Sequence, residues 1–124
     1  MRKKVLIIED EPEIRTILAI AVEHGGEFEA ITAKDGAEGI SMAAEIRPDA
    51  ILLDVLMPGL DGYAVCRLIK EQPQLKDIPV IFITAKSDCA EAAEAGGCAF
   101  IGKPFDPLQL ADKIKFIISG APKQ

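Results

Sequence analysis

Near its N-terminus the chain reads Val5-Leu6-Ile7-Ile8-Glu9-Asp10-Glu11-Pro12, four apolar residues followed by three acidic ones and a proline. A short apolar run without polar alternation is typical of a strand that is covered on both faces, as in a parallel sheet. Pro12 suits the first turn of a helix, where its missing N–H costs no hydrogen bond. The segment therefore predicts a buried strand, an acidic turn and a helix in direct succession.

The alternation of strand and helix continues along the chain. Strong apolar runs stand at residues 50–53 and 80–83, and weaker strand candidates at 29–33 and 99–101. Helical patterns lie between and after them, at residues 14–22, from Asp35, at 62–70, from Asp88 to Gly96-Gly97, and from Asp106-Pro107. Uninterrupted strand–helix–strand repetition predicts an α/β fold, a doubly wound parallel sheet of five strands with five helices and right-handed crossovers.

Apolar periodicity and capping residues define the helices more closely. Asp35 with Glu38 three residues later has the spacing of a capping box. Gly25-Gly26 ends the first helix, and Gly96-Gly97 stops the fourth. The apolar stripes expected to face the sheet are Ile14, Ile17, Leu18, Ala21 and Val22 in the first helix, and Leu110, Ile114, Ile117 and Ile118 in the fifth.

Length and composition indicate one globular domain. The chain has 124 residues and a net charge of -6, which argues against direct binding of nucleic acid. No apolar segment approaches the ~18 residues of a membrane span, and the run after Met1 is too short for a signal peptide. Cys66, Cys89 and Cys98 have no metal-binding spacing and are expected to be reduced thiols of a cytoplasmic protein. We expect the domain to occupy residues 3–118, with 119–124 as a tail or the start of a linker.

Polar residues gather where the predicted strands end. Ligands of open α/β sheets bind outside the carboxyl ends of the strands. The first strand ends in Glu9-Asp10, the third in Asp54 and the fourth in Thr84, while Lys103 comes just after the fifth. These side chains are therefore expected to meet at one edge of the sheet.

Such a group of carboxylates requires positive charge nearby. Two carboxylates ~4 Å apart repel each other by roughly 4 kcal/mol at an effective dielectric constant near 20. Lys103 supplies one positive charge, and a hard divalent cation is the natural source of the rest. Carboxylate oxygens, a backbone carbonyl and waters suit Mg²⁺, with phosphate oxygens completing its octahedron.

Five separated motifs resemble the response-regulator receiver domains of two-component signalling. They stand in the usual order and near the usual spacing over essentially the whole chain. They are Leu6-Ile7-Ile8-Glu9-Asp10-Glu11, Asp49-Ala50-Ile51-Leu52-Leu53-Asp54, Met57-Pro58-Gly59-Leu60-Asp61-Gly62, Ile83-Thr84-Ala85 and Lys103-Pro104-Phe105.

The resemblance implies a flavodoxin-like sheet with strand order 2-1-3-4-5. It implies that Asp54 accepts a phosphoryl group from a phosphohistidine of a sensor kinase or phosphotransfer protein. Asp10, Asp54 and the Leu56 backbone carbonyl would bind Mg²⁺ directly, and Glu9 would bind it through water. Thr84 and Lys103 would each contact a phosphoryl oxygen.

Signal transmission follows from the same resemblance. Phe100 takes the position of the aromatic switch residue, which responds to Thr84. The Lys103-Pro104 bond is often cis in this family. A downstream protein target is expected on the face formed by the fourth helix, the fifth strand and the fifth helix. Such a domain is not an enzyme in the ordinary sense, because it catalyses only its own phosphorylation and dephosphorylation.

One departure and several alternatives stay open at this point. The interval from Thr84 to Lys103 is about one helical turn shorter than is usual in the family, which puts the standard mode of partner docking in doubt. A haloacid-dehalogenase-like phosphotransferase would need a second Asp where Leu56 stands, and a flavodoxin would not place Glu9-Asp10-Glu11 at its phosphate loop. The chain could also be a receiver from a longer regulator with a DNA-binding or enzymatic output domain, or a scaffold receiver that is never phosphorylated.

Overall fold

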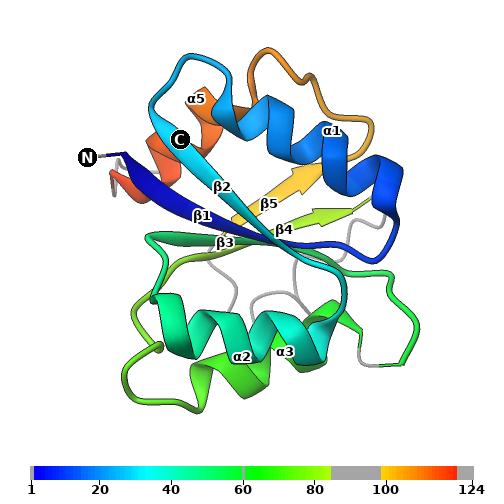
Figure 1. Cartoon of the computed structure of the whole chain (residues 1–124), viewed down its shortest axis with the longest axis vertical. Helices are drawn as coiled ribbons and strands as arrows, with labels where there is room; N and C mark the ends of the chain where they lie inside the picture. Colours follow the sequence, from blue (N-terminus) through cyan, green and yellow to red (C-terminus); the bar gives the residue numbers. More distant parts are fainter. Residues whose placement is uncertain (1, 60, 85–98, 120–124) are drawn as a thin grey trace.

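The computed structural model describes residues 2–59, 61–84 and 99–119, and within them the chain forms one five-stranded parallel sheet flanked by helices (Figure 1). The strand order is β2-β1-β3-β4-β5, which confirms the predicted doubly wound architecture. In chain order the elements are β1 (Lys3–Ile8), α1 (Pro12–Glu23), β2 (Phe28–Ala33), α2 (Gly36–Ile46), β3 (Ala50–Asp54), α3 (Gly62–Lys70), β4 (Val80–Thr84), β5 (Ala99–Gly102) and α5 (Leu110–Ile118).

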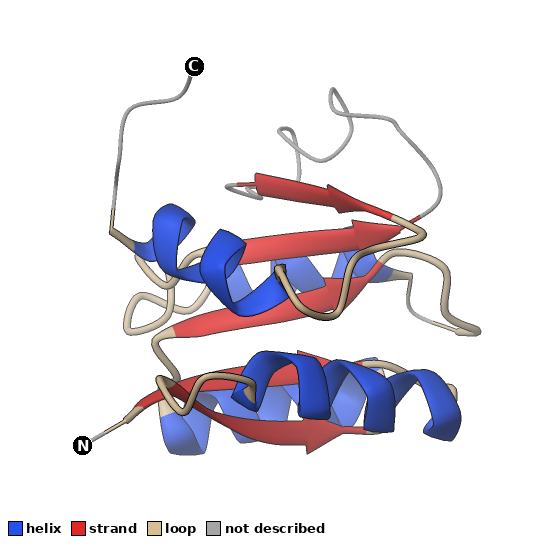
Figure 2. Cartoon of the chain, turned by 90° about the horizontal axis from the view of Figure 1, so that it is seen from above, coloured by secondary structure: helices blue, strands red, loops and turns tan. Residues whose placement is uncertain are grey.

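Helices cover both faces of the sheet and give the molecule three layers. The helices α2 and α3 lie on one face, and α1 and α5 lie on the other (Figures 1 and 2). Alternate residues of β1 therefore enter two separate cores, with Leu6 and Ile8 in one and Val5 and Ile7 in the other. Every residue of β3 and β4 is buried, which explains why these strands read as unbroken apolar runs in the sequence.

Side-chain caps fix where α2 and α3 begin. The Asp35 carboxylate accepts a hydrogen bond from the Glu38 N–H at 2.8 Å, as the spacing predicts. The Glu38 side chain accepts in turn from the Lys34 N–H at 2.9 Å, one residue before the cap. Asp61 caps α3 by accepting from the Ala64 N–H at 2.9 Å. These bonds satisfy N–H groups that have no partner inside the helix.

One expectation about the helices differs from the described structure, and another falls outside it. The prediction that Asp106-Pro107 opens the last helix is wrong, because α5 begins at Leu110. The Asp106 carboxylate accepts from the Leu108 N–H at 2.9 Å, and its carbonyl accepts from the Gln109 N–H at 3.0 Å, so this segment closes a turn before the helix. The predicted fourth helix, from Asp88 to Gly96-Gly97, lies outside the described residues.

The expectations about the cysteines and about membrane spans can be checked within the described residues. The Cys66 thiol is free and buried, and burial raises its pKa to about 11, so it stays protonated and poorly reactive at neutral pH. Cys89 and Cys98 lie outside the described residues. No helix among those described has the length and apolar character needed to span a membrane.

Helix α3 approaches the end of β3 so closely that only glycine fits at its first position. The Gly62 N–H donates to the Val55 carbonyl at 2.9 Å. A Cβ atom on Gly62 would overlap the carbonyl oxygen of Asp54 and lie 2.7 Å from the Cα of Val55. Both obstacles are main-chain atoms, which cannot rotate away as a side chain can.

We expect Gly62→Ala to lower the free energy of unfolding by about 1–3 kcal/mol, the usual effect of overpacking. Chemical denaturation followed by circular dichroism measures this change. The matched control is Gly102→Ala at the end of β5, where an added Cβ would meet nothing within 4 Å. Equal stabilities for the two variants would contradict the tight approach of α3 to the backbone of Asp54.

Candidate functional site

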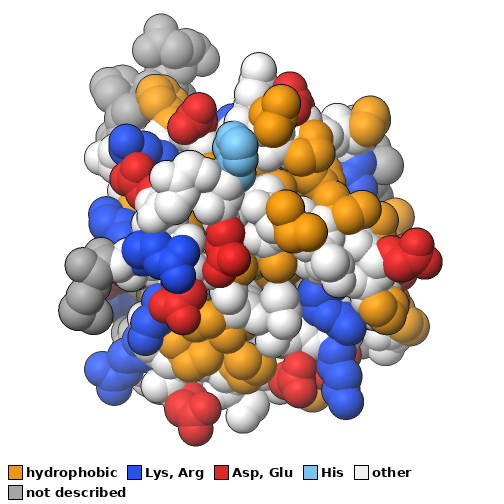
Figure 3. Space-filling view, turned by 45° about the horizontal axis from the view of Figure 1, so that its top comes forward, with side chains coloured by type: hydrophobic (Ala, Val, Ile, Leu, Met, Phe, Trp, Pro, Cys, Tyr) orange, Lys and Arg blue, Asp and Glu red, His pale blue; other side chains and the backbone are white. Residues whose placement is uncertain are grey.

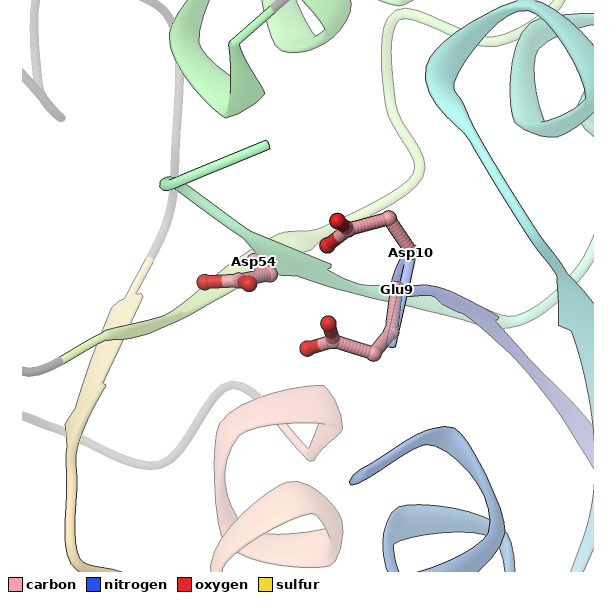
Figure 4. A group of neighbouring side chains, drawn as sticks. All are labelled: Glu9, Asp10 and Asp54. Carbon is pink, nitrogen blue, oxygen red and sulfur yellow. The ribbon is translucent and has the colours of Figure 1, made fainter. Parts of the chain in front are cut away.

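Three carboxylates meet at the carboxyl ends of β1 and β3. Glu9 and Asp10 directly follow β1, Asp54 is the last residue of β3, and the side chains of Glu9 and Asp10 extend toward Asp54 (Figure 4). One carboxylate oxygen from each lies within 4.8 Å of the others. Glu9 is fully buried and Asp54 is only 3% exposed, so water screens their charges poorly. The predicted convergence of these three acids is confirmed.

Lys103 brings one positive charge to this group. Its ammonium nitrogen lies 3.6 Å from Asp54 Oδ1 and 3.9 Å from Glu9 Oε1. The main chain holds the lysine in place, because its N–H donates to the Thr84 carbonyl at 2.9 Å. The Lys103–Pro104 bond is cis. The lysine thus approaches the acids from the β5 side, as the sequence predicts.

Glu9 carries the strongest electrostatic perturbation. Burial is the main cause that raises its pKa to about 8, and the negative charge of Asp54 adds to the rise. A hydrogen bond of 3.0 Å from the Glu11 N–H to Glu9 Oε2 opposes the rise without cancelling it. In the absence of a cation, Glu9 therefore holds its proton at neutral pH.

This pKa predicts how the stability of the metal-free protein depends on pH. The folded state binds the Glu9 proton more tightly than the unfolded chain, so the stability due to this group is present below about pH 4.5 and is lost as the pH rises to about 8. In the presence of EDTA, we expect wild type to be less stable at about pH 8.5 than at about pH 6, by an amount on the order of a few kcal/mol. We expect Glu9→Gln to remove most of this difference and to raise the thermal midpoint at the higher pH by at least about 5 °C.

Thermal unfolding followed by circular dichroism at both pH values measures the effect. Glu45→Gln, which alters an exposed carboxylate on α2, is the control and should leave the pH dependence unchanged. If Glu9→Gln keeps the full pH dependence of wild type, the burial of Glu9 is not its cause.

The donor atoms and the charge of this group fit a hard divalent cation. Glu9 Oε1 and Asp10 Oδ1 are buried and accept no hydrogen bond, so their lone pairs are available. Opposite ligands of an octahedral Mg²⁺ lie about 4.2 Å apart, so three oxygens that lie within 4.8 Å of one another can reach one ion with small side-chain movements. When all three acids are ionised, Lys103 leaves two negative charges uncompensated, and one divalent cation supplies two positive charges.

The other predicted site residues lie around the same sheet edge. Thr84 is buried at the end of β4, beside Gly102 of β5. Phe100 is half-buried on β5, pairs with Phe82 in the sheet register and packs against the core beneath α2 and α3. Leu56 follows Asp54 by two residues and is 61% exposed, with its N–H 3.3 Å from Asp54 Oδ1. The sheet thus brings Thr84 to the same edge as the acids, and the metal-binding role of the Leu56 carbonyl stays a prediction.

An apolar groove beside the site was not predicted from the sequence. Ile17 was expected in the core, but it is 45% exposed. It lines an apolar groove of about 480 Å³ next to Lys103, together with Ile14, Pro104, Phe105 and Pro107. Hydrophobic side chains gather over α1 on this face of the molecule (Figure 3). Ile20, which is 67% exposed, could have given the signal, because Ile14, Ile17 and Ile20 recur every three residues.

The fold and the site together define a class of protein. It has a doubly wound sheet of order 2-1-3-4-5, with an acidic pocket and an opposing lysine at the carboxyl ends of its strands. The family model for the response regulator receiver domain matches residues 5–115. The chain belongs to the response regulator receiver domain family of two-component signalling.

Individual relatives agree with this assignment. The response regulator PleD of Caulobacter vibrioides is 38% identical over 120 residues, which cover 93% of this chain and 26% of PleD. The chemotaxis protein CheY4 of Vibrio cholerae superposes with a TM-score of 0.88 at 28% identity, covering 94% of this chain and 99% of CheY4. The receiver domain of a histidine kinase from Syntrophus aciditrophicus has a TM-score of 0.85 and 38% identity, over 98% of this chain and 94% of that one.

The curated relatives are longer than this chain. The chain covers 46% of a probable transcriptional regulator of Guillardia theta, 26% of PleD and 49% of the PhoP regulator of Bacillus subtilis. It therefore spans half or less of the length of these relatives, and it corresponds to their receiver portion.

Proposed function

We propose that this chain is a phosphorylation switch whose acceptor is Asp54. The observation that carries the proposal is the meeting of Glu9, Asp10 and Asp54 within 4.8 Å, with the Lys103 ammonium 3.6 Å from Asp54. Asp10, Asp54 and the Leu56 carbonyl would hold Mg²⁺, and Glu9 would assist through water. When bound, the cation supplies positive charge that offsets both the carboxylates and the phosphoryl oxygens.

Phosphoryl transfer depends mainly on positioning and on charge neutralisation. One Asp54 oxygen attacks phosphorus in line, the new O–P bond forms, and the P–N bond of the phosphohistidine breaks to release the imidazole. Lys103 donates to one phosphoryl oxygen and the Thr84 hydroxyl to another. The domain catalyses only this transfer and the later hydrolysis of its own acyl phosphate.

Phosphorylation then changes the surface of the domain. The hydroxyl of Thr84 moves toward the phosphoryl group, and Phe100 takes up the space that this movement leaves. A switch of this kind shifts an equilibrium between two existing conformations. Phe100 suits the role because it is half-buried between the core and a groove that α5 also lines.

Two surfaces fit the two partners of a switch. Lys103, whose ammonium lies 3.6 Å from Asp54, also lines the apolar groove, so a sensor kinase or phosphotransfer protein can dock there and present its phosphohistidine. The downstream target binds a second groove, of about 540 Å³, that β5 and α5 line, with Phe100 and the 52% exposed Phe116 among its residues. The contribution of the fourth helix to that face lies outside the described residues.

The domain boundaries and the setting complete the proposal. The receiver occupies residues 3–118, and residues 119–124 form a tail or the start of a linker. The protein acts in the cytoplasm through protein partners rather than by binding nucleic acid itself. Alternatively the receiver controls a DNA-binding or enzymatic output domain of a longer chain.

Incubation with acetyl phosphate tests the proposed function. We expect intact-protein mass spectrometry to detect one added phosphoryl group in the presence of Mg²⁺ and none in the presence of EDTA. Acetyl phosphate loses acetate as the Asp54 O–P bond forms, so no partner protein is needed. An adduct of equal yield with and without Mg²⁺ would contradict a metal-dependent acceptor.

The exposed Leu56 bears on the lifetime of the phosphorylated state. An apolar side chain beside Asp54 cannot orient a water for attack on phosphorus, whereas an amide can. We therefore expect Leu56→Asn to shorten the phosphorylated half-life severalfold, measured as decay of the mass adduct after acetyl phosphate is removed. Decay of wild type as fast as that of the variant would refute this role.

A further inference from the structure

Arg15 of α1 contacts the site in a way that no role described above explains. Its guanidinium Nη1 lies 2.8 Å from the Glu9 carbonyl oxygen and 3.4 Å from the Asp10 carbonyl oxygen. The side chain is half-buried. A guanidinium stays charged at every physiological pH, so both contacts are hydrogen bonds from a permanent cation to main-chain acceptors.

These contacts act on the turn that carries two of the three acids. The turn runs from the end of β1 to Pro12, and Glu11 at the start of α1 makes no side-chain cap. The Glu11 N–H bonds to the Glu9 side chain, and the Arg15 N–H donates to the Glu11 carbonyl at 2.9 Å. Arg15 therefore closes the turn with its own main chain and side chain, and its side chain fixes the peptide groups from which both carboxylates project.

The choice of partner atoms matters for metal binding. An arginine that paired with the carboxylates would occupy the oxygens that a cation needs. Among the described residues Arg15 forms no ion pair, and Glu9 Oε1 and Asp10 Oδ1 stay buried without a hydrogen bond. The guanidinium thus binds the main chain of Glu9 and Asp10 and leaves the ligand atoms of their carboxylates available.

We propose that Arg15 is a positioning residue of the metal site, which holds the Glu9–Asp10 main chain so that both carboxylates face Asp54. This inference rests on the proposed function, because it assumes that the acids bind Mg²⁺. Residues that orient metal ligands usually change metal affinity by about 10–100-fold when they are removed. Arg15→Met removes the charge and both hydrogen bonds but keeps a long, helix-compatible side chain.

The test is the Mg²⁺ dissociation constant of the unphosphorylated protein, measured by isothermal titration calorimetry. We expect Arg15→Met to raise this constant by about tenfold. Arg2→Met is a matched control, because the Arg2 guanidinium also donates to a main-chain carbonyl, that of Phe28 at 3.3 Å, but at the opposite end of β1. The control removes the same charge and the same kind of bond, and it should change the constant less than twofold.

Arg15→Lys keeps the charge but replaces the planar guanidinium, whose Nη1 makes both contacts, with a tetrahedral ammonium on a shorter side chain, so we expect its dissociation constant to lie between those of wild type and Arg15→Met. This variant also decides the question if Arg15→Met fails to fold, since a wild-type constant for Arg15→Lys would then overturn the proposal. Thermal unfolding in EDTA separates positioning from stability. A lower midpoint for Arg15→Met with unchanged Mg²⁺ affinity would show a merely structural role, and equal weakening by Arg2→Met would show a general charge effect.

The failure of this inference differs from the failure of the proposed function. Wild type that binds Mg²⁺ while Arg15→Met binds it equally well overturns the role of Arg15 alone. Wild type that binds no Mg²⁺ overturns both.

Discussion

Replacing Asp54 by Asn is expected to abolish the Mg²⁺-dependent phosphoryl adduct. An amide has no anionic oxygen to attack phosphorus, and the other two acids follow β1 rather than ending β3. We expect a loss of at least about 100-fold in adduct formed from acetyl phosphate, which is full loss by intact-protein mass spectrometry. Persistence of the adduct in this variant would place the acceptor elsewhere.

A matched variant and a stability measurement exclude trivial explanations of that loss. Asp77→Asn changes an exposed carboxylate in the connection before β4 and should keep the full adduct. In EDTA at about pH 8.5, where Glu9 is mostly ionised, Asp54→Asn should unfold at a higher temperature than wild type, because it removes the neighbouring charge that raises the pKa of the buried Glu9. A variant that unfolds at a higher temperature than wild type but forms no adduct is folded and lacks only the phosphoryl acceptor.

Lys103→Gln is expected to have the second largest effect. The ammonium lies 3.6 Å from Asp54 Oδ1, so it can reach an oxygen of a phosphoryl group that arrives there. Removing one such donor from a poorly hydrated site usually lowers the rate by about 100–1,000-fold. The measurement is the initial rate of adduct formation from acetyl phosphate at saturating Mg²⁺.

Lys76→Gln is the control for this substitution, because Lys76 is an exposed lysine in the connection between α3 and β4. Its rate should equal that of wild type. Lys103→Gln also leaves Glu9 and Asp54 without their lysine partner, so its unfolding in EDTA should be compared with wild type before rates are interpreted. If Lys103→Gln forms the adduct at a rate within threefold of wild type, Lys103 does not contribute to the transfer step.

Much of the fold could be predicted because the central strands are buried on both faces. The runs at β1, β3 and β4 are continuous in the sequence since helices cover both sides of them. The site could be predicted for a related reason, because parallel strands place their carboxyl ends at one edge. Glu9, Asp10, Asp54 and Lys103 thus follow from strand ends alone.

The features that escaped prediction depend on tertiary contacts. Asp106 resembles a helix cap, but its bonds to Leu108 and Gln109 complete a turn before α5 starts. Ile17 fits an apolar stripe, yet the lysine–proline segment beside it forms a groove instead of a covering layer. The reach of the Arg15 side chain to two carbonyls has no sequence signal, because any arginine on an exposed helix edge reads in the same way.

The most direct test of the account is the identity of the modified residue. The protein would be incubated with acetyl phosphate and Mg²⁺, the acyl phosphate reduced with borohydride, and the digest analysed by tandem mass spectrometry. Reduction of an aspartyl phosphate leaves homoserine, so we expect homoserine at position 54 and only when Mg²⁺ is present. Homoserine at Asp10 or at another carboxylate, or none in protein that carries the adduct, would contradict it.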